Sequence, residues 1–341
     1  ESRVRKLLPF AVVASFLLAV LLLSGLYYTI TTTAHPWGTT LFTYTHHSDF
    51  VSGVAWSPNG KMLASASWDH TAQVWDARSG AQIATCDGSG DKAGHSDFVS
   101  AIAWSPDSRM VASASWDHTV KVWDAQTCAL LMTYTGHQWG VAALAWSPDG
   151  RYIASGSFDH TVQVWSVSDG RQKSVYKEED FVNALAWSPD GRYIASGGGS
   201  SDIYIMDATS GNVVQLYPHI GEVVNALAWS PGGPYLAAAE RGNTVQIWDT
   251  RTASTLPIQT YNGHHAEVSA LTWSPNGKMI ASASFDHTVQ VWDALSGVTL
   301  LTYKGHQEAV DAVTWSPDGQ KIASGSWDNT VQIWASPSGK S

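Results

Sequence analysis

The sequence predicts an all-β fold in which seven four-stranded units form a seven-bladed β-propeller, preceded by a single transmembrane helix. The tripeptide Trp-Ser-Pro recurs at intervals of 41 to 48 residues, which is the period of a four-stranded propeller blade. The 18 tryptophans and 29 glycines are typical of turn-rich repeat folds rather than helical ones. An apolar N-terminal stretch accounts for the helix. The repeated tryptophans are Trp56, Trp104, Trp146, Trp187, Trp229, Trp273 and Trp315.

The apolar stretch covers residues 7–30, which contain no charged side chain over 24 positions. A helix of this length spans about 36 Å, more than the hydrocarbon core of about 30 Å. Arg3, Arg5 and Lys6 precede it and no basic residue follows before Lys61, so the positive-inside rule places the N-terminus in the cytoplasm. A cleaved signal peptide is the alternative, but the stretch is long for one and lacks a small-x-small cleavage motif.

This reading divides the chain into a cytoplasmic basic stub (1–6), a transmembrane helix (7–30), a linker (31–38), a propeller (39–337) and a tail (338–341). The protein is then a single-pass membrane protein with an extracytoplasmic propeller. Because the sequence begins with Glu1 rather than methionine, we expect a further segment on the cytoplasmic side.

Each repeat reads as four short strands. In the first repeat, strands are expected over 50–56, 62–67, 72–75 and 82–86. Ser57-Pro58-Asn59-Gly60 separates the first two, since proline presets φ and glycine accepts positive φ. The last repeat stops after Trp334, its third strand, whereas residues 40–45 resemble a fourth strand. We therefore expect residues 40–45 to complete the seventh blade and to leave no open edge between first and last blades.

Two dipeptides mark the repeats. Gly-His opens them at residues 94, 136, 263 and 305, and Trp-Asp closes them at residues 75, 123, 248 and 292. On these motifs residues 39–335 resemble the WD-repeat β-propeller family. The resemblance implies loops that gather on one face of a disc and a role in binding rather than catalysis.

A histidine, an aspartate and a tryptophan recur in five repeats at offsets of 22 and then 6 residues, with a serine four positions before the aspartate. Ser, His and Asp together suggest a hydrolase, but a catalytic site is needed once and this set occurs five times. The resemblance assigns it to a structural hydrogen-bond network, and we expect no catalytic residue. The sets are His47, Ser65, Asp69, Trp75; His95, Ser113, Asp117, Trp123; His137, Ser155, Asp159, Trp165; His264, Ser282, Asp286, Trp292; and His306, Ser324, Asp328, Trp334.

The fourth and fifth repeats depart from this set. The fourth has Glu178, Ser200 and Met206 at the histidine, aspartate and tryptophan places. The fifth has Ile220 and Gly242, and keeps only Trp248. We expect these two blades to be locally less stable.

The resemblance also implies a binding face. The residue before each turn aspartate points into this face, and the start of each first strand lies nearby, with Glu267 and Asp311 in comparable places in the sixth and seventh repeats. The alternative is that recent duplication copied the aromatic residues without selection for binding. The predicted binding residues are Trp68, Trp116, Phe158, Arg241, Phe285, Trp327, Phe50, Phe98, Trp139, Phe181, Glu267 and Asp311.

Charge limits the partners. Residues 39–341 contain 16 basic and 28 acidic side chains, a net of −12, which disfavours nucleic acid and suits a basic protein or peptide. We expect no cofactor and no metal site, because His70, His118, His160 and His287 fall on separate turns. Cys86 and Cys128 are expected to lie about 15–20 Å apart along the strands and to remain unpaired.

The sequence thus predicts a non-catalytic scaffold or sensor domain that binds a protein or peptide and is tethered to a membrane. In outline it resembles the extracytoplasmic sensor region of receptor-like bacterial serine/threonine kinases. A propeller hydrolase or lyase would need unrepeated polar groups, and the candidates are Arg241, Glu267 and Asp311. The sequence leaves the oligomeric state open.

Overall fold

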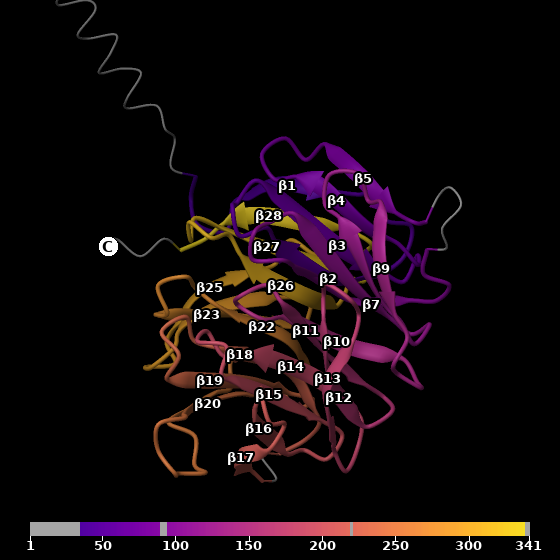
Figure 1. Cartoon of the computed structure of the whole chain (residues 1–341). Coiled ribbons are helices and arrows are strands. Elements are labelled where there is room, and N and C mark those ends of the chain that lie inside the picture. Colours follow the sequence, from indigo (N-terminus) through magenta and orange to yellow (C-terminus); the bar gives the residue numbers. More distant parts are fainter. Residues whose placement is uncertain (1–34, 89–93, 219–220, 338–341) are drawn as a thin grey trace, which may run out of the picture. The chain divides into compact units, whose positions relative to one another are not determined.

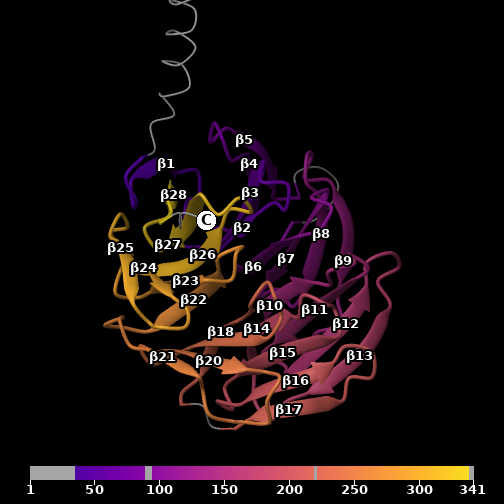
Figure 2. The same ribbon diagram turned by 90° about the vertical axis from the view of Figure 1, so that its left-hand side faces the viewer.

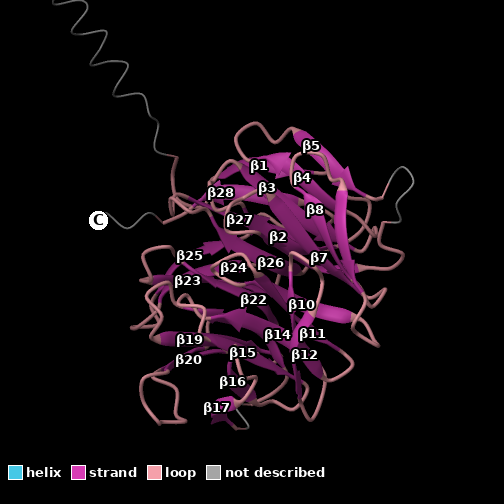
Figure 3. Ribbon diagram, in the orientation of Figure 1, coloured by secondary structure: helices cyan, strands magenta, loops and turns pink. Residues whose placement is uncertain are grey.

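A computed structural model describes residues 35–88, 94–218 and 221–337, and these form seven four-stranded antiparallel sheets (Figures 1 and 3). The compact unit begins at Trp37. Within the described ranges no helix is long and apolar enough to span a bilayer. The predicted transmembrane helix over 7–30 lies outside the described residues.

Each sheet is one blade. In blades 1 to 6 the four strands follow each other in sequence from the inside outwards, whereas the outermost strand of blade 7 is the N-terminal strand β1. Blades 1 to 3 are β2 (Val51–Trp56), β3 (Met62–Ser67), β4 (Ala72–Asp76), β5 (Gln82–Cys86); β6 (Val99–Trp104), β7 (Met110–Ser115), β8 (Val120–Asp124), β9 (Leu130–Tyr134); and β10 (Val141–Trp146), β11 (Tyr152–Ser157), β12 (Thr161–Ser166), β13 (Gln172–Lys177). Blades 4 and 5 are β14 (Val182–Trp187), β15 (Tyr193–Gly198), β16 (Ile203–Asp207), β17 (Val213–Tyr217); and β18 (Val224–Trp229), β19 (Tyr235–Glu240), β20 (Val245–Asp249), β21 (Gln259–Tyr261). Blades 6 and 7 are β22 (Val268–Trp273), β23 (Met279–Ser284), β24 (Val289–Asp293), β25 (Thr299–Tyr303); and β26 (Val310–Trp315), β27 (Lys321–Ser326), β28 (Val331–Ala335), β1 (Thr40–Tyr44).

The blades form a closed ring. Each inner strand contacts the inner strand of the next blade, and β26 contacts β2 in the same way (Figure 2). The N-terminal strand β1 pairs antiparallel with β28, with Tyr44 opposite Val331 and Thr43 opposite Gln332. The predicted closure by residues 40–45 is therefore confirmed. Strand β1 completes blade 7, so that no unpaired strand edge is left between blade 7 and blade 1.

Tryptophan indoles join the inner strands of neighbouring blades. Trp104 donates its Nε1 hydrogen to the carbonyl of Ala55 at 2.9 Å, and Trp146, Trp187, Trp229 and Trp273 repeat this bond. At Trp56 and Trp315 the buried indole nitrogen has no hydrogen-bond partner within the described ranges. The ring is thus less tightly bonded on both sides of blade 7.

Tyrosines join the outer strands. In blade 7 the ring of Tyr44 stacks on Trp75 of blade 1 at 4.5 Å, and its hydroxyl donates to Gln73 at 2.7 Å. The same stack and hydrogen bond join Tyr134 to Trp165 and Gln163. Tyr261 and Tyr303 repeat both interactions with Trp292, Gln290, Trp334 and Gln332. Between blades 1 and 2 this arrangement is replaced, because Cys86 stands at the tyrosine place and Lys121 at the glutamine place.

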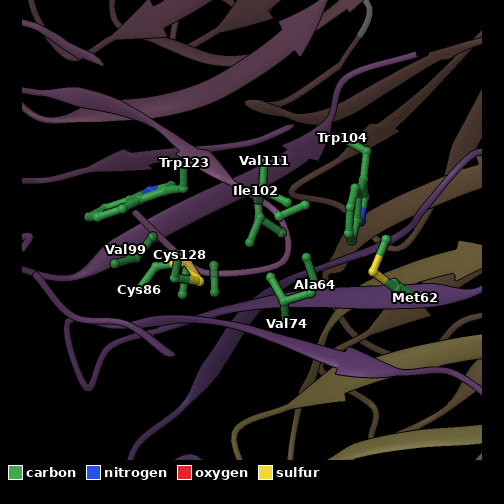
Figure 4. Packing of buried hydrophobic residues seen from close by; sticks show 13 residues of the cluster. Met62, Ala64, Val74, Cys86, Val99, Ile102, Trp104, Val111, Trp123 and Cys128 are labelled. Atoms are coloured by element: carbon green, nitrogen blue, oxygen red, sulfur yellow. A yellow bond between two sulfur atoms is a disulfide. The ribbon is translucent and has the colours of Figure 1, made fainter. Parts of the chain in front are cut away.

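Cys86 and Cys128 form a disulfide with 4.8 Å between their Cα atoms, so the expectation of unpaired thiols was wrong (Figure 4). That expectation treated neighbouring blades as level. In the structure they are staggered, so that the turn between the third and fourth strands of one blade packs against the middle of the preceding blade's fourth strand. Glycines at this turn show the offset: Gly80 faces Phe42, Gly170 faces Met132 and Gly211 faces Ser174. Cys128 occupies the same turn position in blade 2. The residue of blade 1 that corresponds to Phe42 and Met132 is Ala84, which lies two positions before Cys86 in the same strand. The stagger therefore brings the two cysteines close together.

Candidate functional site

The repeated His, Ser, Asp and Trp set forms a buried network in each of the five predicted blades. In blade 1 the Nδ1 atom of His47 lies 2.8 Å from Asp69 Oδ2, and its Nε2 atom lies 2.7 Å from Ser65 Oγ. Asp69 also accepts hydrogen bonds from Thr71 and from the backbone N–H of Ser48. The histidine sets of the other four blades have the same two contacts at 2.8–2.9 Å.

The tryptophan closes the network in four of these blades. Trp123, Trp165, Trp292 and Trp334 donate their indole N–H groups to the network serine at 2.8–3.3 Å. The Trp75 indole nitrogen has no partner within the described ranges. Each serine hydroxyl is fully buried and faces its own histidine rather than an open cavity. In each blade these residues tie together the loop before the inner strand, the second strand, the turn that follows it and the third strand.

The network aspartates are held in the charged form. Burial raises the pKa of Asp69, but hydrogen bonds from His47 and Thr71 outweigh it and lower this pKa to about 2. The pKa of Asp328 is lowered to about 2 for the same reasons, and those of Asp117, Asp159 and Asp286 are also lowered. Burial lowers the pKa of His95, so its ring resists protonation. In blade 2 the folded form therefore pairs a neutral His95 with an ionised Asp117.

Blade 4 places a carboxyl where the other blades have the histidine. Glu178 is 8% exposed and accepts a hydrogen bond from Ser196, the network serine of this blade. Its Oε2 atom is buried without a partner within the described ranges. Burial and the nearby Asp202 charge raise the pKa of Glu178 to about 7, although the Ser196 hydrogen bond opposes the shift. Met206 fills the tryptophan place and is also buried.

Blade 5 lacks the network. Trp248 is fully buried, but its indole donates to the Thr255 carbonyl instead of a serine, because Ala238 occupies the serine place. Gly242 lies in an open turn, and Ile220 is outside the described residues. The fourth strand, β21, has only three residues.

The predicted binding residues lie at one end of the ring. We call this end the upper face; it contains the loops that enter each inner strand and the turns between second and third strands. Two positions per blade matter here. The tip position is the residue before the turn aspartate, and the start position precedes the inner strand and accepts a backbone hydrogen bond from the tip residue. Tips are Trp68, Trp116, Phe158, Gly199, Arg241, Phe285 and Trp327, and starts are Phe50, Phe98, Gly140, Phe181, Val223, Glu267 and Ala309.

Tip and start aromatics contact one another in a continuous series, which we call the aromatic arc. Its successive ring-centroid distances are Phe285–Trp327 4.9 Å, Trp327–Phe50 4.9 Å, Phe50–Trp68 5.3 Å, Trp68–Phe98 4.6 Å, Phe98–Trp116 5.9 Å, Trp116–Phe158 5.5 Å and Phe158–Phe181 5.5 Å. The arc is open over blades 4 to 6, where Arg241 Nε lies 3.8 Å from Glu267 Oε2. The predicted residues therefore line an incomplete ring, and Trp139 lies outside the arc.

Below the arc lies a cavity of about 280 Å³ at the centre of the ring. Its wall is formed by the second residue of each inner strand. Three of these residues are serines, Ser52, Ser100 and Ser269, and each donates a hydrogen bond to a backbone carbonyl of the next blade. On the opposite side, Asn225 donates to Glu267 at 2.8 Å and Asn183 donates to Asn225 at 3.3 Å. The cavity wall is thus polar, in contrast to its aromatic mouth.

Asp311 belongs to this wall and not to the start positions. The sequence had grouped it with Glu267, but Ala309 holds the start position of blade 7 and Asp311 lies two residues deeper. Burial raises the pKa of Asp311 to about 7, and the Glu267 charge adds to the shift. The indole N–H of Trp327 lies beside this carboxyl and partly opposes the rise of its pKa. This indole nitrogen is buried and makes no direct hydrogen bond within the described ranges.

Charge is distributed unequally between the two ends of the ring. The lower turns carry ten acidic and ten basic side chains, whereas the described upper loops and adjoining strand ends carry seventeen acidic and four basic ones. The upper basic residues are Lys121, Lys177, Arg241 and Lys304. The negative net charge of the propeller is therefore an upper-face property.

The four histidines that the sequence raised as possible metal ligands lie in tight turns. His70, His118, His160 and His287 all have positive φ angles of 65–69° in their turns. The described ranges contain no group of His, Cys, Asp and Glu side chains that could hold a metal ion.

The disulfide was not predicted, although the sequence contained a signal for it. Cys86 replaces a tyrosine and Cys128 replaces a glycine that other blades repeat, and both replacements fall at the same seam between blades.

Family comparisons agree with this architecture. A family model described as the IFT122 first beta-propeller matches residues 84–255. A second, described as WD domain, G-beta repeat, matches residues 38–76, 255–293 and 297–335. The matches over 38–76 and 297–335 each run from a fourth strand to the third strand of the following blade, as expected when one sequence repeat bridges two blades. The chain belongs to the WD-repeat β-propeller family.

Proposed function

We propose that this propeller is a non-catalytic interaction module whose upper face captures a basic protein or peptide. One observation carries the proposal: the aromatic arc borders much of the mouth of a cavity whose wall bears carboxyls, on the face that holds the excess negative charge. Arginine and lysine side chains bind favourably over aromatic rings next to carboxylates. Clustered tryptophans are also the side chains that contribute most to protein interfaces.

The competing proposal, a propeller hydrolase or lyase, has weaker support. The serines and histidines that could form a triad are buried in five copies, each histidine beside its own aspartate. Among the unrepeated polar groups, Arg241 is paired with Glu267, and Glu267 also accepts from Asn225. This pairing favours a role for these groups in shaping the cavity rather than in acid–base chemistry.

The binding test uses a nine-residue lysine–glycine peptide and a matched glutamate–glycine peptide. In the full chain we expect the lysine peptide to bind and the glutamate peptide not to bind. Replacing Trp68 and Trp327 together by alanine should weaken lysine-peptide binding at least tenfold, about 1.4 kcal/mol, because both rings border the cavity mouth. The checks are isothermal titration calorimetry and the melting temperature.

The matched control is Trp37→Ala, since Trp37 is an exposed tryptophan, 56% accessible, that does not line the cavity. This variant should bind like the parent chain. Equal binding by the double variant would show that the upper aromatic residues do not form the interface.

We further propose that the propeller is tethered to a bacterial-type membrane and lies outside the cytoplasm. Two features support this placement: the uncharged 7–30 stretch behind a basic flank, and the disulfide, since disulfides persist in oxidising compartments. Such a placement is that of the sensor region of a receptor-like serine/threonine kinase, which is the finer form of the proposal.

Amine labelling with a membrane-impermeant reagent tests the placement. Lys61 and Lys278 are exposed on the lower turns, so intact cells that produce the chain should yield labelled propeller peptides containing them. The membrane fraction should retain the chain after carbonate extraction. Labelling that appears only after lysis would place the propeller on the other side of the membrane.

A further inference from the structure

A phenylalanine at the start position fills the space between two neighbouring tips in blades 1 and 2. Phe50 lies 4.9 Å from the blade 7 tip Trp327 and 5.3 Å from its own tip Trp68. Phe98 lies 4.6 Å from Trp68 and 5.9 Å from Trp116. In blade 4, Phe181 packs on the preceding tip Phe158 in the same way. The upper surface thus alternates tip and start rings.

Blade 3 breaks the alternation. Its start residue is Gly140, which lies between the tips Trp116 and Phe158, and a Cβ atom built there would lie 3.3 Å from Trp116 Cα and 3.4 Å from Phe158. The residue before it is Trp139, whereas the acidic residues Asp49, Asp97 and Asp180 hold this place in blades 1, 2 and 4. In blade 3 the aromatic residue therefore stands one position earlier in the sequence than in blades 1, 2 and 4.

A pocket of about 640 Å³ occupies this position. Trp116 and Phe158 form its inner wall, with their ring planes inclined at 75°, and Trp139 and Phe181 also line it. Trp139 is 65% exposed and Trp116 is 42% exposed, both high for tryptophan. Ala309 of blade 7 is the other small start residue between two aromatic tips, but it is buried and its tips lie 4.9 Å apart.

We propose that this blade 3 pocket receives an aromatic side chain from the bound protein or peptide, which completes the alternation of rings. The inference rests on the proposed function, since it assigns one residue class to the partner. In blades 1 and 2 a phenyl ring at the start position lies 4.6–5.9 Å from the tip rings on either side, measured between ring centroids. Offset and edge-to-face contacts in this range are those that aromatic pairs prefer.

A quaternary ammonium ion is the main alternative occupant of an aromatic pocket. The acidic residue on this pocket is Asp97, and its Oδ1 atom already accepts the backbone N–H of Phe98 at 2.8 Å. The acid that would lie nearest an ammonium group in blade 3 is replaced by Trp139. The wall is therefore better suited to an uncharged ring than to a cation.

The first test uses p-cresol, the side-chain analogue of tyrosine, with tetramethylammonium as the competing probe. We expect saturable p-cresol binding to the full chain by saturation-transfer NMR. Gly140→Phe should weaken it more than tenfold because the new ring fills the pocket. Trp139→Ala, which removes the outer wall without crowding the backbone, should weaken it severalfold, and Trp37→Ala should leave it unchanged.

The melting temperature shows whether the Gly140→Phe variant folds. If that variant does not fold, p-cresol binding by the Trp139→Ala variant tests the proposal. Binding of p-cresol that survives both substitutions would overturn the proposal. So would saturable tetramethylammonium binding that Gly140→Phe abolishes while p-cresol binding is absent.

The second test links the pocket to the partner. A lysine–glycine peptide with one central tyrosine should bind the parent chain at least fivefold more tightly than the same peptide with leucine. The two peptides should bind Gly140→Phe equally. If both peptides bind the parent chain equally, the pocket proposal fails while the basic-partner proposal stands. If p-cresol binds but neither peptide does, the pocket stands and the basic-partner proposal fails.

Discussion

Replacing Cys86 and Cys128 by serine is expected to lower the free energy of unfolding by roughly 4 kcal/mol, the chain-entropy value for a closed loop of this size. The two cysteines are 42 residues apart, and their bond joins the outer parts of blades 1 and 2. This seam has no tyrosine–tryptophan stack and no tyrosine–glutamine hydrogen bond to take over. Loss of the bond should therefore loosen the ring at this seam. Urea unfolding followed by tryptophan fluorescence measures the change.

A matched variant distinguishes the missing cross-link from general damage at the seam. The triple change Cys86→Tyr, Lys121→Gln and Cys128→Gly gives this seam the residues that join blades 2 and 3. The new tyrosine would stack on Trp123 and hydrogen-bond to the new glutamine, as Tyr134 does with Trp165 and Gln163. We expect it to recover most of the lost stability. An unchanged serine variant would show that the disulfide does not hold the seam.

Replacing Glu178 by glutamine is expected to raise the free energy of unfolding at pH 8 by about 3 kcal/mol, because the pKa of this carboxyl is raised from 4.5 to about 7 and each unit corresponds to about 1.36 kcal/mol. The folded chain favours the protonated carboxyl, so ionisation destabilises the fold increasingly between the ordinary glutamate pKa of 4.5 and about pH 7. Above that range the penalty is constant, and below about pH 4.5 the two proteins should be equally stable. Denaturant unfolding at several pH values measures the difference.

Glu179→Gln is the control, because Glu179 is the exposed neighbour of Glu178 and carries the same charge. It should change stability little at any pH. A Glu178→Gln difference that stays the same from pH 4 to pH 8 would show that ionisation of this carboxyl is not the cause. The acid loss shared by both proteins then reports the network aspartates, whose lowered pKa values make the fold lose stability as the pH falls below about 4.

The residue spacing of one blade could be read without coordinates. Ser57-Pro58-Asn59-Gly60 forms the expected turn, with Gly60 at a φ of 70°. The serine, histidine, aspartate and tryptophan of each network lie within one repeat, and the offsets place them together wherever four strands pair in order. The closing strand β1 was visible as a fourth strand without its own blade. The exceptions in blades 4 and 5 were visible in the same way, as residues that break a repeated pattern.

The relation between blades could not be read in this way. Whether Cys86 meets Cys128 depends on how far one sheet is offset from the next, and all seven sheets packed around the ring set that offset. The ion pair between Arg241 and Glu267 and the pocket at Gly140 likewise bring together residues of different blades. Hydrogen bonds and turns within about 40 residues therefore determined the blade from its sequence alone, whereas twist and packing between sheets, which act between residues of different repeats, were decided only by the tertiary structure.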